Sequence, residues 1–273
     1  MTKSITLSKV VLAGAGPGDP DLITVKAFRY LTTADVLVVD RLVDHSLLNY
    51  AKLGVKIFFV GKEGGNPNSF TQENINQLLV SEAKSGKLVL RLKGGDVSFF
   101  SNIFSELETL VENHIPYEII PGVTSASGAA ACAGIPLTAR NYSNSVRFLS
   151  YTHPETIDEQ QMNELARTED TLVFFMAAKN VRQLVGSLVA QDITSDKWIA
   201  VIEEATTPNQ RVTVLPISSF TETTRDIKFR SPAMIIIGKV SQLHHRFHWV
   251  TNEDKDSSFF PSIDQTILKT KVA

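Results

Sequence analysis

Residues 11–20, VLAGAGPGDP, decide the fold, because an apolar run passes directly into a glycine-rich turn and then into a helix start. The apolar run predicts a buried strand. Asp19 is a good N-cap, and Pro20 suits the first position of a helix. An apolar stripe at helical spacing follows, made of Leu22, Val25, Ala27, Phe28 and Leu31. The stretch therefore predicts a strand, a tight turn and a helix in succession, as in α/β folds.

The turn is not a dinucleotide-binding fingerprint. A GxGxxG motif that begins at Gly14 needs a third glycine or an alanine where this chain has Asp19. Pro17 and Pro20 have no N–H to donate to a phosphate, and Asp19 would repel one. Two interpretations remain from the turn alone: a plain strand-to-helix connection, or a turn that contacts another kind of ligand.

Short runs rich in valine and isoleucine recur through the first half, with helix-like patterns between them. These runs cover residues 10–12, 36–39, 56–60, 88–92 and 117–120. Such alternation predicts parallel strands joined by crossover helices. Residues 124–132 predict a further helix with small side chains, for which Thr124 is the expected cap. The first half is thus predicted to be an α/β domain.

The second half predicts another sheet, after a polar, turn-prone boundary at Pro136 and residues 141–144. Strands are expected at residues 146–151, 171–176, 198–202, 211–215 and 233–237, with helices near residues 158–167 and 180–190. This sheet is expected to be mixed. The length of 273 residues also favours two domains. We therefore predict domains at residues 1–140 and 141–250, and a mobile or docked tail at 251–273.

The composition excludes several classes of protein. With 43% hydrophobic and 21% charged residues the chain is typical of globular proteins, and its net charge of -2 argues against a broad nucleic-acid-binding face. Cys132 is the single cysteine, which rules out an intrachain disulfide and fits a cytoplasmic location. No stretch approaches the roughly 18 apolar residues of a membrane helix, and no zinc-type spacing of cysteine and histidine is present.

Polar or glycine-rich motifs follow four consecutive predicted strands. Asp40-Arg41 follows the second, Gly61-Lys62 the third, Lys93-Gly94-Gly95-Asp96 the fourth and residues 121–126, PGVTSA, the fifth. Any one of these charged residues is more often a cap or a solvated charge. Because the carboxyl ends of parallel strands share one edge of a sheet, the four together predict a ligand site.

Taken in order, the segments AGAGPGDP, VVDRLV, VGK, RLKGGD, PGVTSASGAAA and AGIPLTAR resemble the uroporphyrinogen-III C-methyltransferases, which are tetrapyrrole methylases. FFMAAKN, EEATTPNQRV and SPAMIIIGKV extend the resemblance through the second half. It implies two α/β domains with S-adenosylmethionine bound in the cleft between them, and usually a homodimer. It also implies methylation of uroporphyrinogen III at carbons 2 and 7 to precorrin-2, with S-adenosylhomocysteine as the second product, in sirohaem or cobalamin biosynthesis.

The resemblance also implies roles for individual residues. The positions that match cofactor contacts are Pro17, Gly94, Gly95, Asp96, Phe99, Thr124, Ser125, Met176 and Ala205. Asp40 and Lys62 match the proton acceptor and the proton donor, and Lys62 has a second interpretation as an anchor for a substrate carboxylate. Glycines would allow close backbone approach to the cofactor, and a sulfonium favours oxygen lone pairs and soft or apolar walls.

The substrate carries eight carboxylates, so cations near the motif strands are candidates to bind it. They are Arg41, Lys62, Arg91, Lys93, Arg140 and Arg147, of which Arg41 is favoured because it directly follows Asp40. Each of them alone would more often be a surface charge.

The chain departs from the family pattern at three places. Val97 replaces a usual proline, residues 101–104 replace a loop that often contains arginine, and Ala205 replaces a frequent glycine. The loop change weakens the expected substrate contacts at that edge. Three alternatives stay open: a methyltransferase acting later on the corrin path, a nicotinamide oxidoreductase, and a catalytically silent ligand-binding protein.

Overall fold

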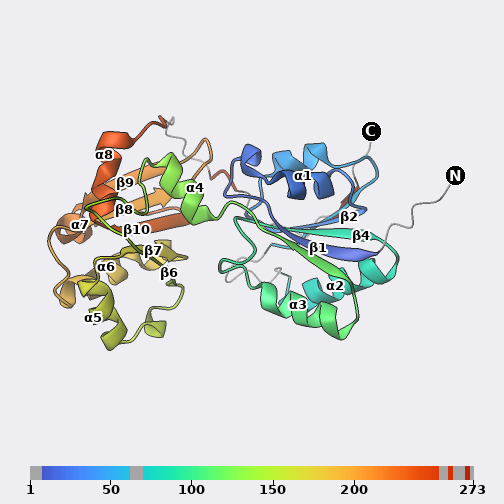
Figure 1. Ribbon diagram of the computed structural model, residues 1–273, viewed down its shortest axis with the longest axis horizontal. Coiled ribbons are helices and arrows are strands. Elements are labelled where there is room, and N and C mark those ends of the chain that lie inside the picture. Colours follow the sequence, from blue (N-terminus) through green and yellow to red (C-terminus); the bar gives the residue numbers. More distant parts are fainter. Residues whose placement is uncertain (1–7, 62–69, 252–257, 261–267, 271–273) are drawn as a thin grey trace. The chain divides into compact units, whose positions relative to one another are not determined.

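The computed structural model describes residues 8–61, 70–251, 258–260 and 268–270. By contacts between residues the chain divides into two compact units. The first holds residues 1–125 and 260–273, and the second holds residues 126–259. Each unit has its own sheet, which confirms the predicted α/β class (Figure 1). Among the described residues, no helix combines the length and the apolar character needed to cross a membrane.

The sheet of the first unit has the strand order β11-β3-β2-β4-β1-β5. Its strands are β1 (Lys9–Gly14), β2 (Val36–Val39), β3 (Lys56–Phe59), β4 (Leu88–Lys93), β5 (Tyr117–Ile120) and β11 (Leu268–Thr270). All pairs are parallel except β11 with β3. The central strands β2 and β4 are buried along their whole length, as expected when helices cover both faces of a parallel sheet.

Two apolar cores lie on opposite faces of this sheet, because successive residues of a strand point to opposite sides. Val11 and Ala13 pack in the core that contains α1 (Val25–Leu31), and Val10 and Leu12 pack in the other core. That second core contains α2 (Gln72–Lys84) and α3 (Ile103–Glu112). In Figure 1, α1 covers one face of the sheet and α2 and α3 cover the other. The short 3-10 segments of this unit are η1 (Pro20–Leu22) and η2 (His45–Tyr50).

The predicted first helix is wrong at its start. Asp19 caps only the 3-10 turn η1, where its side chain accepts from the N–H of Asp21. Ile23 and Thr24 are extended, and the α-helix begins after Thr24, whose hydroxyl accepts from the N–H of Ala27 at 3.3 Å. Val25 is 67% exposed and does not belong to the buried stripe. A second good N-cap within the pattern therefore divided one expected helix into two elements.

The sheet of the second unit has the order β6-β7-β10-β8-β9. Its strands are β6 (Val146–Ser150), β7 (Thr171–Phe175), β8 (Trp198–Glu203), β9 (Arg211–Pro216) and β10 (Ala233–Gly238). Only β6 and β7 pair in parallel, so the sheet is mixed, as predicted. The helices are α4 (Ser125–Cys132), α5 (Glu159–Arg167), α6 (Val181–Ala190), α7 (Ile217–Thr223) and α8 (His244–Phe247), with 3-10 segments η3 (Pro154–Thr156), η4 (Ala178–Asn180) and η5 (Lys239–Leu243).

The first unit ends before the predicted boundary at residue 140. The reason is α4, whose small side chains Ala126, Ala129 and Ala130 are buried in the same core as Ala200 and Ile236 of the second sheet. The tail also divides differently from the prediction, since β11 adds an edge strand to the first sheet. The polar residues after Pro136 thus form a loop within a unit rather than a link between two.

Candidate active site

The carboxyl ends of β1, β4 and β5 meet at one edge of the first sheet, and three glycines let them approach. A Cβ atom on Gly14 would lie 2.5 Å from the carbonyl oxygen of Gly95 and 2.7 Å from Cα of Gly122. A Cβ atom essentially never lies this close to a non-bonded backbone atom, so any other residue at Gly14 would force the backbone to shift. The sequence predicts close approach of the cofactor at the glycines, and the structure shows that they also let the backbone segments pack against each other.

Backbone hydrogen bonds fix this edge further. The N–H of Gly95 donates to the carbonyl of Gly16 at 2.7 Å, and the N–H of Gly16 donates back at 3.2 Å. Gly95 has φ +69°, a conformation that favours glycine, and a Cβ there would meet Oγ of Ser125 at 2.9 Å. The turn after β1 and the turn after β4 are therefore one rigid piece.

Asp96 ties the third loop to these two. Its side chain is buried, with Oδ1 accepting from the N–H of Ser98 at 2.7 Å and Oδ2 accepting from the N–H of Gly122 at 2.7 Å. Both carboxylate oxygens are thus used to hold the loops after β4 and β5. The structure gives Asp96 a clear role in shaping the edge, and its predicted contact with the cofactor stays a prediction.

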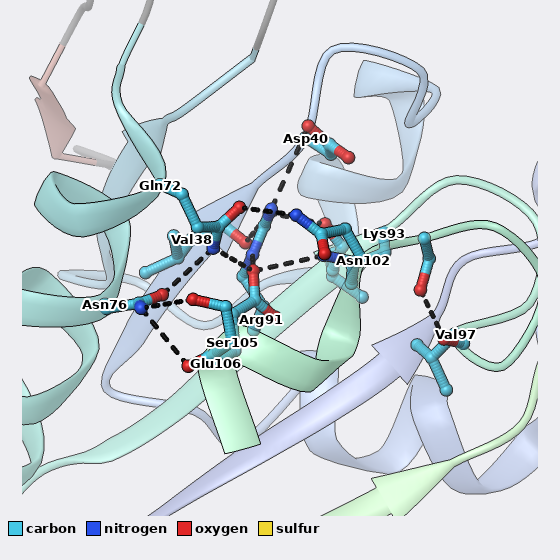
Figure 2. A network of polar contacts seen from close by, with 12 residues as sticks. Val38, Asp40, Gln72, Asn76, Arg91, Lys93, Val97, Asn102, Ser105 and Glu106 are labelled. Carbon is cyan, nitrogen blue, oxygen red and sulfur yellow. Dashed lines mark hydrogen bonds and ion pairs between the residues drawn. The ribbon is translucent and has the colours of Figure 1, made fainter. Parts of the chain in front are cut away.

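Beside this edge lies a group of charged side chains that we call the Glu106 cluster: Asp40, Arg91, Lys93 and Glu106 (Figure 2). Glu106 of α3 is 0% exposed, and its Oε1 accepts from Nε of Arg91 and from Nζ of Lys93, each at 3.1 Å. The NH2 nitrogen of Arg91 lies 3.9 Å from Oδ1 of Asp40, whose side chain is partly exposed at the end of β2. The buried carboxylate of Glu106 thus faces the buried cations of Arg91 and Lys93. Arg91 also faces the partly exposed carboxylate of Asp40.

The electrostatics of the cluster follow from its burial. Burial lowers the pKa of Lys93, and the neighbouring guanidinium of Arg91 lowers this pKa further, while Glu106 and Asp40 act against both. Arg91 is 2% exposed and Lys93 is 3% exposed. The sequence placed both among the cations for substrate carboxylates. Both side chains donate to Glu106, and Arg91 also faces Asp40, so a contact of either one with a substrate carboxylate stays a prediction.

Arg41 differs from these two buried cations. Its Nε atom is buried and has no hydrogen-bond partner, and in the part of the chain that the structure describes Arg41 makes no ion pair. A cation without a counter-ion at the carboxyl end of a strand is suited to an anionic ligand. Lys62, the predicted proton donor, lies outside the described residues. The prediction for Lys62 is therefore not tested.

Apolar side chains are exposed on the loop and helix that follow β4. Phe99 is 36% exposed, Phe100 is 44% exposed and Phe104 is 67% exposed. Phe100 and Asn102 adopt the left-handed conformation, with φ +50° and +52°, which non-glycine residues seldom adopt away from constrained sites. A loop of this kind offers flat apolar surface next to the charged edge.

Two further predicted positions share one edge of the second sheet. Met176 directly follows β7, and Ala205 lies two residues beyond the end of β8. Strand β10 lies between β7 and β8 and is antiparallel to both, so the carboxyl ends of β7 and β8 lie at the same end of the sheet. Met176, Glu204 and Thr206 all have positive φ. Ala205 itself does not, so replacement of a glycine by alanine introduces no backbone strain there.

The remaining predicted positions lie at the edge of the first unit. Thr124 does not form the predicted cap, because its buried Oγ1 has no hydrogen-bond partner among the described residues. Pro17 is buried in the turn after β1, and Ser125 begins α4. Across the described residues, no group of three or more histidine, cysteine, aspartate or glutamate side chains could hold a metal ion.

Comparison with known proteins now places the chain. The model of the family described as Tetrapyrrole (Corrin/Porphyrin) Methylases matches residues 9–221. The chain belongs to the tetrapyrrole methylase family. Curated relatives support this: a siroheme synthase of Vesicomyosocius okutanii is 39% identical over 91% of this chain, and one of Nitrosomonas europaea is 37% identical over 95%. The matches cover 53% and 55% of those two proteins, so this chain spans about half of their length.

Solved structures of tetrapyrrole methylases share the fold. A uroporphyrin III C-methyl transferase of Thermus thermophilus is 33% identical, with a TM-score of 0.71 over 86% of this chain and 99% of that one. The same enzyme has been solved complexed with S-adenyl homocysteine, at 32% identity. A cobalt precorrin-4 methyltransferase is 26% identical with a TM-score of 0.77, over 88% of this chain and 99% of that one. The nicotinamide alternative is therefore dropped.

Sequence reasoning missed one functional candidate in this tetrapyrrole methylase, Glu106. A signal for it was present, because Ile103, Leu107 and Leu110 form the apolar stripe of α3 and Glu106 lies within that stripe. A carboxylate on the buried face of a helix needs a cation, and Arg91 and Lys93 on a buried strand are suitable cations. The position of Glu106 within the apolar stripe of α3 could therefore have predicted the Glu106 cluster from the sequence.

Proposed function

We propose that this chain is an S-adenosylmethionine-dependent C-methyltransferase that converts uroporphyrinogen III to precorrin-2 by methylation at carbons 2 and 7. The observation that carries the proposal is the end of β2, where the partly exposed carboxylate of Asp40 is followed by Arg41, a cation with no counter-ion among the described residues. Asp40 can accept a proton, and Arg41 can bind a carboxylate of a polycarboxylate substrate. The names of the siroheme synthase relatives and of the Thermus enzyme support the same activity.

Substrate binding is assigned first to the cations of this edge. Arg41 lacks a counter-ion among the described residues, so it can bind a substrate carboxylate without first losing another partner. Lys62, Arg91 and Lys93 remain further candidates, and Arg91 also faces Asp40 at 3.9 Å. The exposed rings of Phe99, Phe100 and Phe104 suit the flat apolar face of a tetrapyrrole.

Asp40 is proposed as the proton acceptor. Adding a methyl group to a pyrrole carbon leaves a cation, and the ring system recovers when a neighbouring bridge carbon loses a proton to a base. Asp40 is exposed enough to take that proton, and its carboxylate is oriented by Arg91. Lys62 is proposed as the proton donor.

The cofactor is proposed to be bound by Pro17, Gly94, Gly95, Asp96, Phe99, Thr124, Ser125, Met176 and Ala205. When bound, S-adenosylmethionine supplies the methyl group. The residues fit this ligand, because Thr124 offers a hydroxyl oxygen with no partner among the described residues. Met176, a residue that is 50% exposed, offers a soft thioether. Rigid loops after β1 and β4 would hold it in line with the reacting carbon.

The test is anaerobic incubation of the purified chain with uroporphyrinogen III and S-adenosylmethionine, followed by absorbance and mass spectrometry. The expected product carries two added methyl groups. Asp40→Asn should lower turnover by about 100-fold or more and keep S-adenosylhomocysteine binding. Unchanged turnover in Asp40→Asn would remove Asp40 from the mechanism.

A second candidate function is methylation of a later corrin intermediate. Its support is the TM-score of 0.77 to a cobalt precorrin-4 methyltransferase. If uroporphyrinogen III is not methylated while S-adenosylhomocysteine binds, later corrin intermediates become the substrates to try. The resemblance in DRLV and VGK favours uroporphyrinogen III.

The assembly and the location are also proposals. We propose a homodimer, which size-exclusion chromatography with light scattering will test by a mass of about twice 30.1 kDa. We propose a cytoplasmic location, for which the presence of a single cysteine is the support. Fractionation of cells that express the tagged chain tests it.

A further inference from the structure

The Glu106 cluster contains a buried carboxylate that the proposed function does not use. Glu106 lies on α3, while Arg91 and Lys93 lie on β4, and Figure 2 shows the three side chains converging beneath Asp40. Oε2 of Glu106 is buried and has no hydrogen-bond partner among the described residues. All of the Glu106 contacts that the structure shows are therefore made by Oε1.

The guanidinium of Arg91 is held on two of its three nitrogens. Its Nε donates to Glu106, and its NH1 donates to the carbonyl oxygens of Val38 at 3.3 Å and Leu92 at 3.1 Å. A guanidinium is planar, so fixing these two nitrogens also fixes the third. The third nitrogen, NH2, is the one that lies 3.9 Å from Asp40.

The backbone of Asp40 is fixed to the same strand. Its N–H donates to the carbonyl of Leu92 at 3.0 Å, and that carbonyl also accepts from Arg91. The carboxylate of Asp40 is the least constrained part of the arrangement, since its side chain is 31% exposed. Arg91 is the cation that faces this carboxylate, at 3.9 Å.

Polar side chains of α2 support Glu106 from the other side. Gln72 donates to Oδ1 of Asn76 at 2.9 Å and lies 3.5 Å from Oε1 of Glu106. Asn76 in turn donates to the hydroxyls of Ser105 and Thr109, each at 2.9 Å. The bonds from Asn76 join α2 to α3, the helix that carries Glu106.

We propose that Glu106 is a positioning residue for the methyl transfer, which orients Arg91 and through it the carboxylate of Asp40. This inference rests on the proposed function, because Asp40 must be the proton acceptor for its orientation to affect turnover. A purely structural Glu106 would instead only neutralise two buried cations. The two roles give different kinetics.

Steady-state kinetics of Glu106→Gln is the first test. The carboxamide keeps the shape of the side chain and loses the charge that grips Arg91. We expect kcat to fall about 10- to 100-fold, with the KM for uroporphyrinogen III and the affinity for S-adenosylhomocysteine changed less than about threefold. The matched control is Glu108→Gln, which alters an exposed residue of the same helix and should behave as wild type. Equal kcat in wild type and Glu106→Gln would overturn the proposal.

A second pair of variants covers the case in which Glu106→Gln does not fold. Lys93→Met together with Glu106→Leu removes one charge of each sign and leaves Arg91 and Asp40 as a balanced pair. The reference is Lys93→Met alone, in which Glu106 still holds Arg91. We expect the double variant to show a kcat about 10-fold or more below that of the single variant. If the two match, Glu106 serves only to balance Lys93, and the proposal is wrong.

A readout without turnover separates this inference from the proposed function. In an NMR spectrum of nitrogen-15-labelled protein, the Nε–H signal of Arg91 is identified by its loss in Arg91→Lys. Both Glu106→Gln and Asp40→Asn should shift this signal, because Arg91 joins the two carboxylates. A signal that Asp40→Asn leaves in place would overturn the inference even if wild type methylates uroporphyrinogen III. If wild type makes no methylated product but both variants shift the signal, the proposed substrate is wrong and the coupling of Glu106 to Asp40 stands.

Discussion

Two carboxylates of the first unit each face two cations, at opposite edges of the same sheet. Glu106 lies between Arg91 and Lys93 at the carboxyl edge, 0% exposed. Glu118 of β5 lies 2.7 Å from Nζ of Lys9 and 2.5 Å from Nζ of Lys26, with its side chain 25% exposed. Each group consists of one carboxylate and two cations, but the side chains of the Glu118 group are partly exposed to solvent and those of Glu106, Arg91 and Lys93 are buried.

The difference in exposure gives the two groups different effects on stability. Charges in water cost little to separate, so the Glu118 group should add modest, salt-dependent stability. Charges in the interior are costly unless they are paired, so removing one partner of the Glu106 cluster should cost more than removing one partner of the Glu118 group. The buried group also lies next to Asp40 at the edge where parallel sheets bind their ligands, and the exposed group does not.

The largest expected effect is the loss of stability in Glu106→Leu. Removing this carboxylate leaves Arg91 and Lys93 buried without their shared partner, which should lower the free energy of unfolding by about 3–5 kcal/mol. Urea unfolding at pH 7, followed by circular dichroism, measures it. Glu108→Leu, at an exposed position of the same helix, should stay within about 0.5 kcal/mol of wild type. A loss below about 1 kcal/mol in Glu106→Leu would mean that water reaches the two cations.

A smaller effect with a defined pH dependence is expected for Glu118→Gln. Hydrogen bonds from Lys26, Lys9 and Tyr30 lower the pKa of Glu118 from 4.5 to about 2. Because the folded-state pKa is depressed, this stability is complete above the unfolded pKa and is lost as the pH falls from about 5 toward 2. After allowance for solvent screening, wild type should exceed Glu118→Gln by about 1–2 kcal/mol at pH 7.

Unfolding free energies of wild type and Glu118→Gln between pH 2 and pH 7 check this expectation. The difference should close near pH 2 and should shrink in 1 M salt. A difference that persists at pH 2 would show that the glutamine disturbs packing rather than charge. The same salt series on Glu106→Leu should leave its deficit nearly unchanged, since salt does not screen a buried pair well.

The strands were predictable from the sequence because they are short runs rich in valine and isoleucine between helix-like patterns. Residues 36–39 match the fully buried β2 in both limits, and residues 117–120 match β5, an edge strand that is partly exposed. The mixed second sheet also follows the prediction. The start of the first helix was not predictable from periodicity, since Asp19 and Thr24 are both good caps and only the extended backbone at Ile23 and Thr24 decides between them. The boundary was placed late because a helix of small residues gives no sign of which sheet it packs against.

The candidate site was predictable in its location and less so in its chemistry. Gly95 and Asp96 are predicted to contact the cofactor, which stays a prediction. The structure shows in addition that they hold loops together, and this depends on backbone distances that no sequence pattern reports. The arginines of the site differ in their partners. Arg91 is buried and faces Asp40 and Glu106, whereas Nε of Arg41 has no hydrogen-bond partner among the described residues. A sequence shows charge but not which charges share a partner.

The smallest expected effect belongs to Lys93→Met. Arg91 and Glu106 remain paired after this change, so stability at pH 7 should move by no more than about 1 kcal/mol. Because the pKa of Lys93 lies below its ordinary 10.5 in the folded state, wild type should gain stability as the pH rises through that lowered pKa toward 10.5. Lys93→Met should lack this gain, and exposed Lys87→Met should keep it, in urea unfolding from pH 7 to pH 10. If Lys93→Met and Lys87→Met follow the same curve, Lys93 keeps its proton in the folded state, and its ion pair with Glu106 offsets the effect of burial on its pKa.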